Sequence, residues 1–156
     1  MTIRSATPED AAQIADIWND AIRNTTITFN PVEKSVSEVA DLCAKHCLVW
    51  NDGGRVLGFA RFFQFRGGEG YRHTGEHTIL LHPDGRGRGG GRALMGATCD
   101  AAKAAGYHSL FAGCSVENRG AVAFHAACGF RTVATLPEVG FKFGRWIDLV
   151  LMQKML

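Results

Sequence analysis

The chain has 156 residues, 46% of them hydrophobic and 21% charged, with 17 basic against 15 acidic side chains. This length and composition predict one globular domain over residues 1–156 and exclude a disordered or fibrous protein. The small net charge gives no support for a nucleic-acid partner, and no apolar run reaches the ~18–20 residues of a membrane helix. Five cysteines and an N-terminus without a signal-peptide pattern favour reduced thiols in the cytoplasm.

The first half of the chain predicts two helices between strands. Thr7 and Pro8 favour a helix start, because a hydroxyl residue suits the N-cap and proline suits the first helical position. Apolar residues then recur at three- and four-residue spacing up to Ile22, which gives that helix one buried face. The elements expected here are a strand at 3–6, helices at 8–23 and 35–46, and strands at 47–50 and 56–65.

The second half alternates strands with glycine-terminated helices. Apolar residues lie on both faces of the last strand, and this pattern predicts a strand that is covered on both sides. The resulting order, βααβββαβαββ, predicts a mixed α/β fold. The elements expected here are a loop at 66–75, a strand at 76–82, a loop at 85–91, a helix at 92–105, a strand at 109–115, a helix at 119–128 and strands at 130–136 and 146–152.

The run from His82 to Leu94 holds five glycines and three arginines between a strand and a helix. Uncovered backbone N–H groups at a helix start form an anion site that suits phosphates. The alternative is a surface turn that binds nothing. The spacing Gly85-x-Gly87-x-x-Gly90 matches a dinucleotide fingerprint, but no acid ends the next strand, and no Gly-Lys-Ser/Thr of a P-loop follows.

Four separated motifs carry a resemblance to a known family. Arg86-x-x-Gly89-x-Gly91 resembles the acetyl-CoA motif of the GCN5-related N-acetyltransferases, the GNAT superfamily, and residues 118–130 resemble its second signature. Residues 71–78 and 140–148 resemble the branch of phosphinothricin and methionine sulfoximine/methionine sulfone N-acetyltransferases. The resemblance implies a GNAT fold, with a mostly antiparallel mixed sheet flanked by helices. It also implies acetyl transfer from acetyl-CoA to the α-amino group of a small amino-acid-like acceptor.

The same resemblance implies a cofactor site. The backbone of Ile79, Leu80 and Leu81 would hydrogen-bond the acetyl-pantetheine arm, as if the cofactor extended the sheet. Asn118 would contact the pantetheine or nucleotide portion, although an asparagine there can also serve only as a helix N-cap. The residues expected to hold the pyrophosphate are Gly87, Arg88, Gly89, Gly90, Gly91 and Arg92.

An acetyl transfer to an amine needs a base, because an ammonium must lose a proton before its nitrogen can attack. Glu76 is the candidate base, directly or through a water, and the backbone N–H around Leu81 is the candidate oxyanion donor. His125 occupies the position where many superfamily members carry a tyrosine that protonates the departing CoA thiolate. A histidine can do this near neutral pH, but a packed or cofactor-contacting histidine is an equal alternative.

The resemblance also places residues in an acceptor pocket. Arg66 would grip the acceptor carboxylate, with Arg72 as a second candidate. Gly67 and Gly68 stand where relatives carry bulkier residues, which predicts a more open pocket wall. Phe143, where phosphinothricin enzymes tend to have histidine, favours acceptors of the methionine sulfoximine type. The remaining residues expected to line the pocket are Phe29, Glu76, His77 and Thr78.

Further expectations concern metals, partners and competing functions. Cys43, His46 and Cys47 do not make a convincing four-ligand site, so we expect no metal. The resemblance implies a homodimer. The alternatives to acetylation of an amino-acid-like acceptor are a GNAT enzyme acting on another small amine or a protein N-terminus, a non-catalytic CoA-binding sensor, and, more distantly, a nicotinamide dinucleotide protein.

Overall fold

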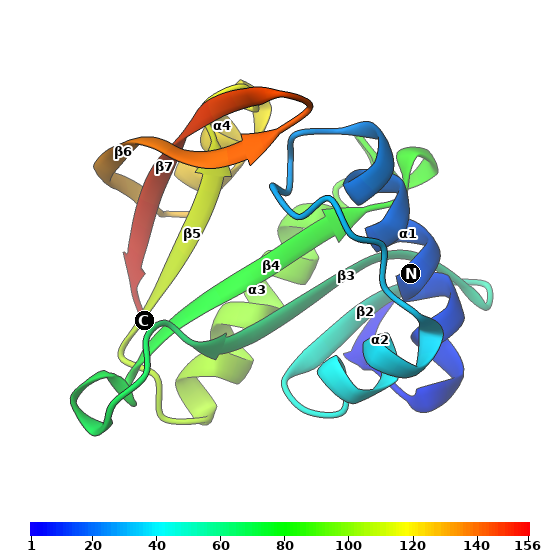
Figure 1. Cartoon of the computed structure of the whole chain (residues 1–156). Coiled ribbons are helices and arrows are strands. Elements are labelled where there is room, and N and C mark those ends of the chain that lie inside the picture. The colour runs from blue at the N-terminus through cyan, green and yellow to red at the C-terminus, as the bar shows by residue number, and fades with distance from the viewer.

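The computed structural model describes residues 1–156 and contains one seven-stranded sheet with helices on both faces (Figure 1). The strands lie in the order β1-β2-β3-β4-β5-β7-β6, and only β4 and β5 run parallel. The element order and the mixed α/β class predicted from the sequence are confirmed. The strands are β1 (Thr2–Ser5), β2 (Cys47–Asp52), β3 (Arg55–Gln64), β4 (Thr74–Leu81), β5 (Ser109–Ser115), β6 (Arg131–Lys142) and β7 (Arg145–Met155).

Four helices cover the sheet, and their apolar faces define separate cores. Trp18 and Ile14 of α1 pack with Phe59 and Leu80 on one face. Residues of α3 pack with β5 and β7 on the other face, where α4 also lies. The helices are α1 (Ala11–Asn24), α2 (Val36–Leu42), α3 (Gly90–Ala104) and α4 (Arg119–Ala127), with short 3-10 turns at Pro8–Asp10, Glu69–Tyr71 and Pro83–Gly85.

The boundaries of three helices differ from the expectations. The expected start of α1 is a 3-10 turn, and the α-helix begins only at Ala11. The expected second helix ends early, at Leu42, with Cys43 as its C-cap, and His46 adopts a left-handed φ of 54° just before β2 begins. The third helix begins two residues earlier than expected, at Gly90, which packs beneath the indole of Trp50.

The C-terminal hairpin of β6 and β7 is longer than expected and carries a bulge. The pairing register shifts between Leu136 and Gly140, and Glu138 takes a φ of 51° while its N–H donates to the Asp148 carboxylate at 2.8 Å. The prediction that the last strand is covered on both sides was wrong at its start. Trp146 is 61% exposed, because no helix packs over the outer end of the hairpin.

Three general features complete the fold. None of the helices combines the length and the apolar character that crossing a membrane requires. All five cysteines are free thiols, and four of them are buried. No three histidine, cysteine, aspartate or glutamate side chains gather in a group that could hold a metal ion.

Candidate functional site

The site lies where two neighbouring strands part. β4 and β5 pair only from Thr74–Ser109 to His77–Ala112, and beyond this point β5 pairs with β7 alone. Figure 1 shows the two strands diverging. The edge of β4 from Thr78 to Leu81 therefore faces β5 without a strand partner. Side chains and backbone from both strands line a cavity of about 850 Å³, a volume that suits a large small-molecule ligand.

One end of this cavity is formed by the glycine-rich turn before α3. Gly87 and Gly89 adopt left-handed φ angles of 72° and 80°, and no atom lies within 4 Å of where a Cβ would stand on either. The turn is thus open, and its backbone leads into the N-terminus of α3, where N–H groups attract anions. Gly87 lines the cavity itself, and so does Arg86.

The other arginines of this turn point away from the cavity. Arg88 donates to the Asp52 carboxylate at 2.6 Å and lies over the Trp50 ring, while Arg92 donates to the Ala127 carbonyl at 3.0 Å. Their side chains anchor the turn to β2 and α4. Arg88, Gly89, Gly90, Gly91 and Arg92 shape the turn but do not line the cavity.

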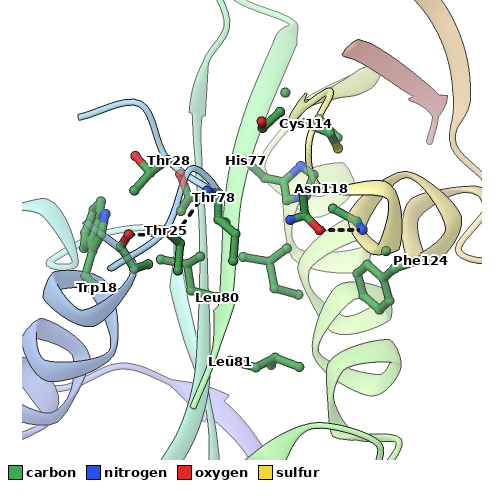
Figure 2. Close-up of a pocket in the computed structure, with 18 of the residues that line it drawn as sticks. Trp18, Thr25, Thr28, His77, Thr78, Leu80, Leu81, Cys114, Asn118 and Phe124 are labelled. Carbon is green, nitrogen blue, oxygen red and sulfur yellow. Dashed lines mark hydrogen bonds between the residues drawn. The ribbon is translucent and has the colours of Figure 1, made fainter. Parts of the chain in front are cut away.

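Glu76 and Thr78 line the same cavity from one side of β4. The carboxylate of Glu76 is half-buried and takes part in no ion pair, and this burial raises the pKa of Glu76. A carboxylate with a raised pKa and no cation to neutralise it suits a general base. Thr78 extends on the side of β4 opposite His77, as Figure 2 shows. The backbone of Ile79, Leu80 and Leu81 completes this wall.

His77 and His125 meet on the other side of β4. Both rings are buried and line the cavity, and their Nε2 atoms lie 3.0 Å apart. Burial lowers the pKa of each ring, that of His77 to about 3. Asn118 lies nearby at the start of α4, where its Oδ1 accepts from the Ala121 N–H at 3.1 Å (Figure 2). The N-cap expected as one alternative for Asn118 is therefore present, and Asn118 also lines the cavity.

A segment between the first two helices forms the outer wall. Residues 25–30, which include Phe29, are held by the C-terminal hairpin. Lys142 Nζ, which is buried, donates to the Thr25 and Thr28 carbonyls at 2.6 and 2.8 Å. Glu117 accepts from Arg145 at 2.6 Å and from the Thr26 hydroxyl at 2.9 Å.

Four residues expected at the acceptor do not line the cavity. The guanidinium of Arg66 lies 5.6 Å from the centre of the Tyr71 ring, and Arg72 contacts His73 and Glu69. All four belong to the loop between β3 and β4, which Gln64 holds through the carbonyls of Arg66 and Gly68. The four residues are Arg66, Gly67, Gly68 and Arg72.

The cavity also contains residues that the sequence analysis did not select. Lys34 Nζ lies 4.9 Å from the centre of the Trp18 ring, and both side chains line the wall formed by α1 and the segment after it. Cys114 lines the cavity beside His125, at 3.6 Å from its Nδ1. Arg86 could have been selected, because it belongs to the glycine–arginine motif. Lys34, Trp18 and Cys114 belong to no motif, and only the tertiary fold brings them to the cavity.

Comparison with known proteins connects this site to one family. Residues 14–130 match the acetyltransferase (GNAT) family. The chain is 37% identical over 161 residues to the L-methionine sulfoximine/L-methionine sulfone acetyltransferase of Salmonella typhimurium, covering 98% of this chain and 93% of that protein.

Two solved structures are similar over the whole chain. An acetyltransferase from Salmonella typhimurium, determined with acetyl-CoA, has a TM-score of 0.96 and 35% identity, and the match covers 100% of this chain and 94% of that one. The ribosomal-protein-alanine N-acetyltransferase of Brucella melitensis has a TM-score of 0.96 and 34% identity, with 100% of both chains covered.

Proposed function

This chain belongs to the GNAT family of acetyltransferases and uses acetyl-CoA as its acetyl donor, and from this premise we propose that its acceptor is the α-amino group of a small amino-acid-like molecule. Methionine sulfone and methionine sulfoximine represent this class. The observation that carries the proposal is one cavity that joins an open glycine turn, an unpaired strand edge and a half-buried carboxylate.

The chain's own residues fit the donor. The unpaired edge of β4 offers backbone groups of Ile79, Leu80 and Leu81 to an amide-bearing arm, as a neighbouring strand would. The turn of residues 87–92 offers backbone N–H groups to the pyrophosphate, and Arg86 adds the cation that lines the cavity. Arg88 and Arg92 would contribute through their backbone, since their side chains are engaged elsewhere. Asn118 would contact the pantetheine portion.

The reaction requires two protons to leave the acceptor nitrogen. Glu76 would take the first, directly or through a water, and so expose the lone pair that attacks the thioester carbonyl. The Leu81 N–H would stabilise the oxyanion that forms on that carbonyl. His125 would then supply a proton to the sulfur as the C–S bond breaks, and the second proton of the acceptor nitrogen would replace it. The acceptor would lie between these groups and Phe29, with Thr78 and His77 beside it.

Lys34 is the group that the structure offers to the acceptor carboxylate. The cavity is lined by two permanent cations, and Arg86 belongs to the glycine turn. Lys34 takes part in none of the ion pairs, so its charge is available. Its backbone is fixed to α1, because the Asn19 side chain accepts from its N–H and donates to its carbonyl, both at 2.8 Å.

Replacement of Lys34 by methionine is therefore expected to raise the KM for methionine sulfone about tenfold, as the loss of one charged hydrogen bond would. The KM for the carboxamide of the same acceptor should not change, because that molecule lacks the negative charge. Arg66→Ala, measured in parallel, tests the cation that the sequence alone selected. An equal KM shift of Lys34→Met on both acceptors would remove Lys34 from the carboxylate site.

A homodimer that forms through the C-terminal hairpin is a further part of the proposal. Phe141, Phe143 and Trp146 are each more than half exposed there, and the rings of Phe141 and Trp146 lie 4.8 Å apart. Exposed aromatic clusters of this kind mark contact surfaces. We expect sedimentation velocity to give a dimer for the wild type and a monomer for Trp146→Asp. Val32→Asp, at an equally exposed apolar residue elsewhere, should stay dimeric, and a dimeric Trp146→Asp would contradict the assignment.

The proposal also includes one domain over residues 1–156 and a location in the cytoplasm, which the five free thiols support. A protein N-terminus is the second candidate acceptor, because one similar structure is that of a ribosomal-protein-alanine N-acetyltransferase. A non-catalytic CoA sensor would bind CoA without turnover.

Release of free CoA thiol from acetyl-CoA tests the function directly. The acceptor panel holds methionine sulfone, methionine sulfoximine, phosphinothricin, ordinary amino acids, a polyamine and an alanine-starting peptide. We expect saturable turnover on the sulfone and the sulfoximine. Turnover on the peptide alone would show that the acceptor is a protein N-terminus and not a small amino-acid-like molecule. CoA binding without thiol release with any acceptor would support the non-catalytic sensor.

A further inference from the structure

The hydrogen bonds of His77 and His125 require one more hydrogen than two neutral imidazole rings carry. His77 Nδ1 lies 3.0 Å from the Phe111 carbonyl oxygen, and His125 Nδ1 lies 2.8 Å from the Ala121 carbonyl oxygen. A carbonyl oxygen only accepts, so both contacts are hydrogen bonds only when each Nδ1 carries a hydrogen. A neutral imidazole carries one hydrogen, which leaves both Nε2 atoms with lone pairs, 3.0 Å apart. A third proton between the two Nε2 atoms would satisfy all three contacts.

The surroundings of the pair oppose that third proton in the resting enzyme. Both rings are buried, and Phe130 packs against both at ring distances of 5.4 and 5.2 Å. Burial disfavours a positive charge and lowers the pKa of both rings. Cys114 on β5 is the one other titratable group in contact, and burial raises its pKa to about 11, so it stays a neutral thiol. The neighbouring carboxylate, Glu76, lies on the other side of β4.

A negative charge beside the pair would favour the third proton that burial disfavours. Both residues line the cavity in which the thioester would be cleaved, and a thiolate that forms there stabilises a cation at short range. The gain would be large, because both rings are buried and little water reaches them to screen the charges. The pair is therefore built to accept one proton during the reaction and to lose it afterwards.

We propose that His77 and His125 act as one unit that holds a single proton between their Nε2 atoms and delivers it to the departing sulfur. This inference rests on the proposed function. His125 would contact the sulfur, and His77 is a positioning residue that acts through His125. As the C–N bond forms and the C–S bond breaks, the second proton of the acceptor nitrogen passes to the pair and then to the sulfur. The pair ends with its original two protons, and nothing is oxidised or reduced.

Kinetics of His77→Phe test this role. The phenyl ring keeps the volume but cannot share a proton, so kcat should fall about 100-fold while both KM values stay unchanged. His77→Gln, which can donate a hydrogen bond but cannot carry a proton, should recover only part of that loss. The double variant His77→Phe/His125→Phe should be no slower than His125→Phe alone, because two residues that act as a unit are not additive.

Val39→Ala is the control for a purely structural loss, because Val39 of α2 is completely buried but neither contacts the pair nor lines the cavity. It should lower the melting temperature without lowering kcat. A wild-type kcat in His77→Phe, or losses that multiply in the double variant, would overturn the proposal. Turnover by the wild type on the acceptor panel is measured independently, so a failure of the proposed function is distinguished from a failure of the pair.

Nitrogen NMR of the histidine rings gives a readout that does not depend on turnover or on a variant that folds. In the free enzyme and with CoA thiol bound, both Nδ1 atoms should be protonated and both Nε2 atoms should carry lone pairs, because the pair holds a third proton only while the sulfur is a thiolate. A ring that is protonated at Nε2 in place of Nδ1 in either state would overturn the proposal, as would two rings that titrate independently.

Discussion

Glu76→Gln is expected to lower kcat by about 100-fold or more and to leave the affinity for acetyl-CoA unchanged. The size follows from the contribution of a positioned general base. The amide keeps the shape of the side chain, and Glu76 takes part in no ion pair whose loss would disturb the fold. Steady-state turnover with methionine sulfone and calorimetric titration with acetyl-CoA measure the two effects separately. Turnover like that of the wild type would remove Glu76 from the role of base.

The pH dependence gives a second test of the same residue. Glu76 must be ionised to accept a proton, so kcat/KM should fall as the pH drops through its pKa. Because burial raises that pKa, the fall should begin at a higher pH than an exposed carboxylate would give. This acidic limb should be absent from Glu76→Gln. Glu69→Gln, at a carboxylate whose side chain is 94% exposed in the β3–β4 loop, should retain both the rate and the limb.

Gly90→Ala is expected to weaken acetyl-CoA binding by tenfold or more, or about 1.4 kcal/mol. A Cβ on Gly90 would overlap the indole of Trp50, which is almost completely buried and cannot withdraw without moving the start of α3. Overpacking of this kind costs about 1–3 kcal/mol of stability as well. The change in affinity should follow because the displaced helix start carries the N–H groups that we assign to the pyrophosphate. Calorimetry and thermal unfolding measure the two effects.

Gly96→Ala is the matched control for this substitution, because Gly96 lies in the same helix with no atom within 4 Å of a Cβ. It should leave the affinity unchanged and stabilise the protein by about 0.5–1 kcal/mol, since alanine suits a helix interior better than glycine. Gly89→Ala is the intermediate case, because a φ of 80° strains any other residue without a steric clash. Wild-type affinity in Gly90→Ala would contradict the assignment of the glycine turn.

Local patterns in the sequence were sufficient for the order of the elements. The apolar face of α1 and the glycine that ends α3 depend on neighbours in the chain, and both were predictable. The end of α2 and the bulge in β6 were not, because the positive φ angles of His46 and Glu138 near these points occur at residues that are not glycine. Exposure of Trp146 was missed for another reason, since the two-sided apolar pattern of a strand does not say what covers each side.

The motifs indicated which backbone segments contribute to the candidate site. They did not indicate which residues the side chains in those segments contact. Gly87 and the edge of β4 lie where the motifs indicated. The orientations of the Arg88 and Arg92 side chains could not be predicted from the sequence, because their partners Asp52 and Ala127 are about 35 residues away in the chain. Lys34 lines the cavity only because Asn19 holds its backbone against α1.

The hydrogen bonds from Lys142 to Thr25 and Thr28 join residues that are 117 and 114 positions apart. The glycine turn and the 25–30 wall of the cavity can therefore form at different times while the chain is being synthesised. The glycine turn and α3 are made from contiguous residues, so a growing chain can complete them early. The 25–30 segment is translated before them, but the hydrogen bonds from Lys142 that hold it can form only when the last hairpin has left the ribosome. Without this hairpin, the 25–30 segment would lose the two bonds that fix it as the outer wall of the cavity. Selectivity for the acceptor is, in this sense, the last property that the protein acquires.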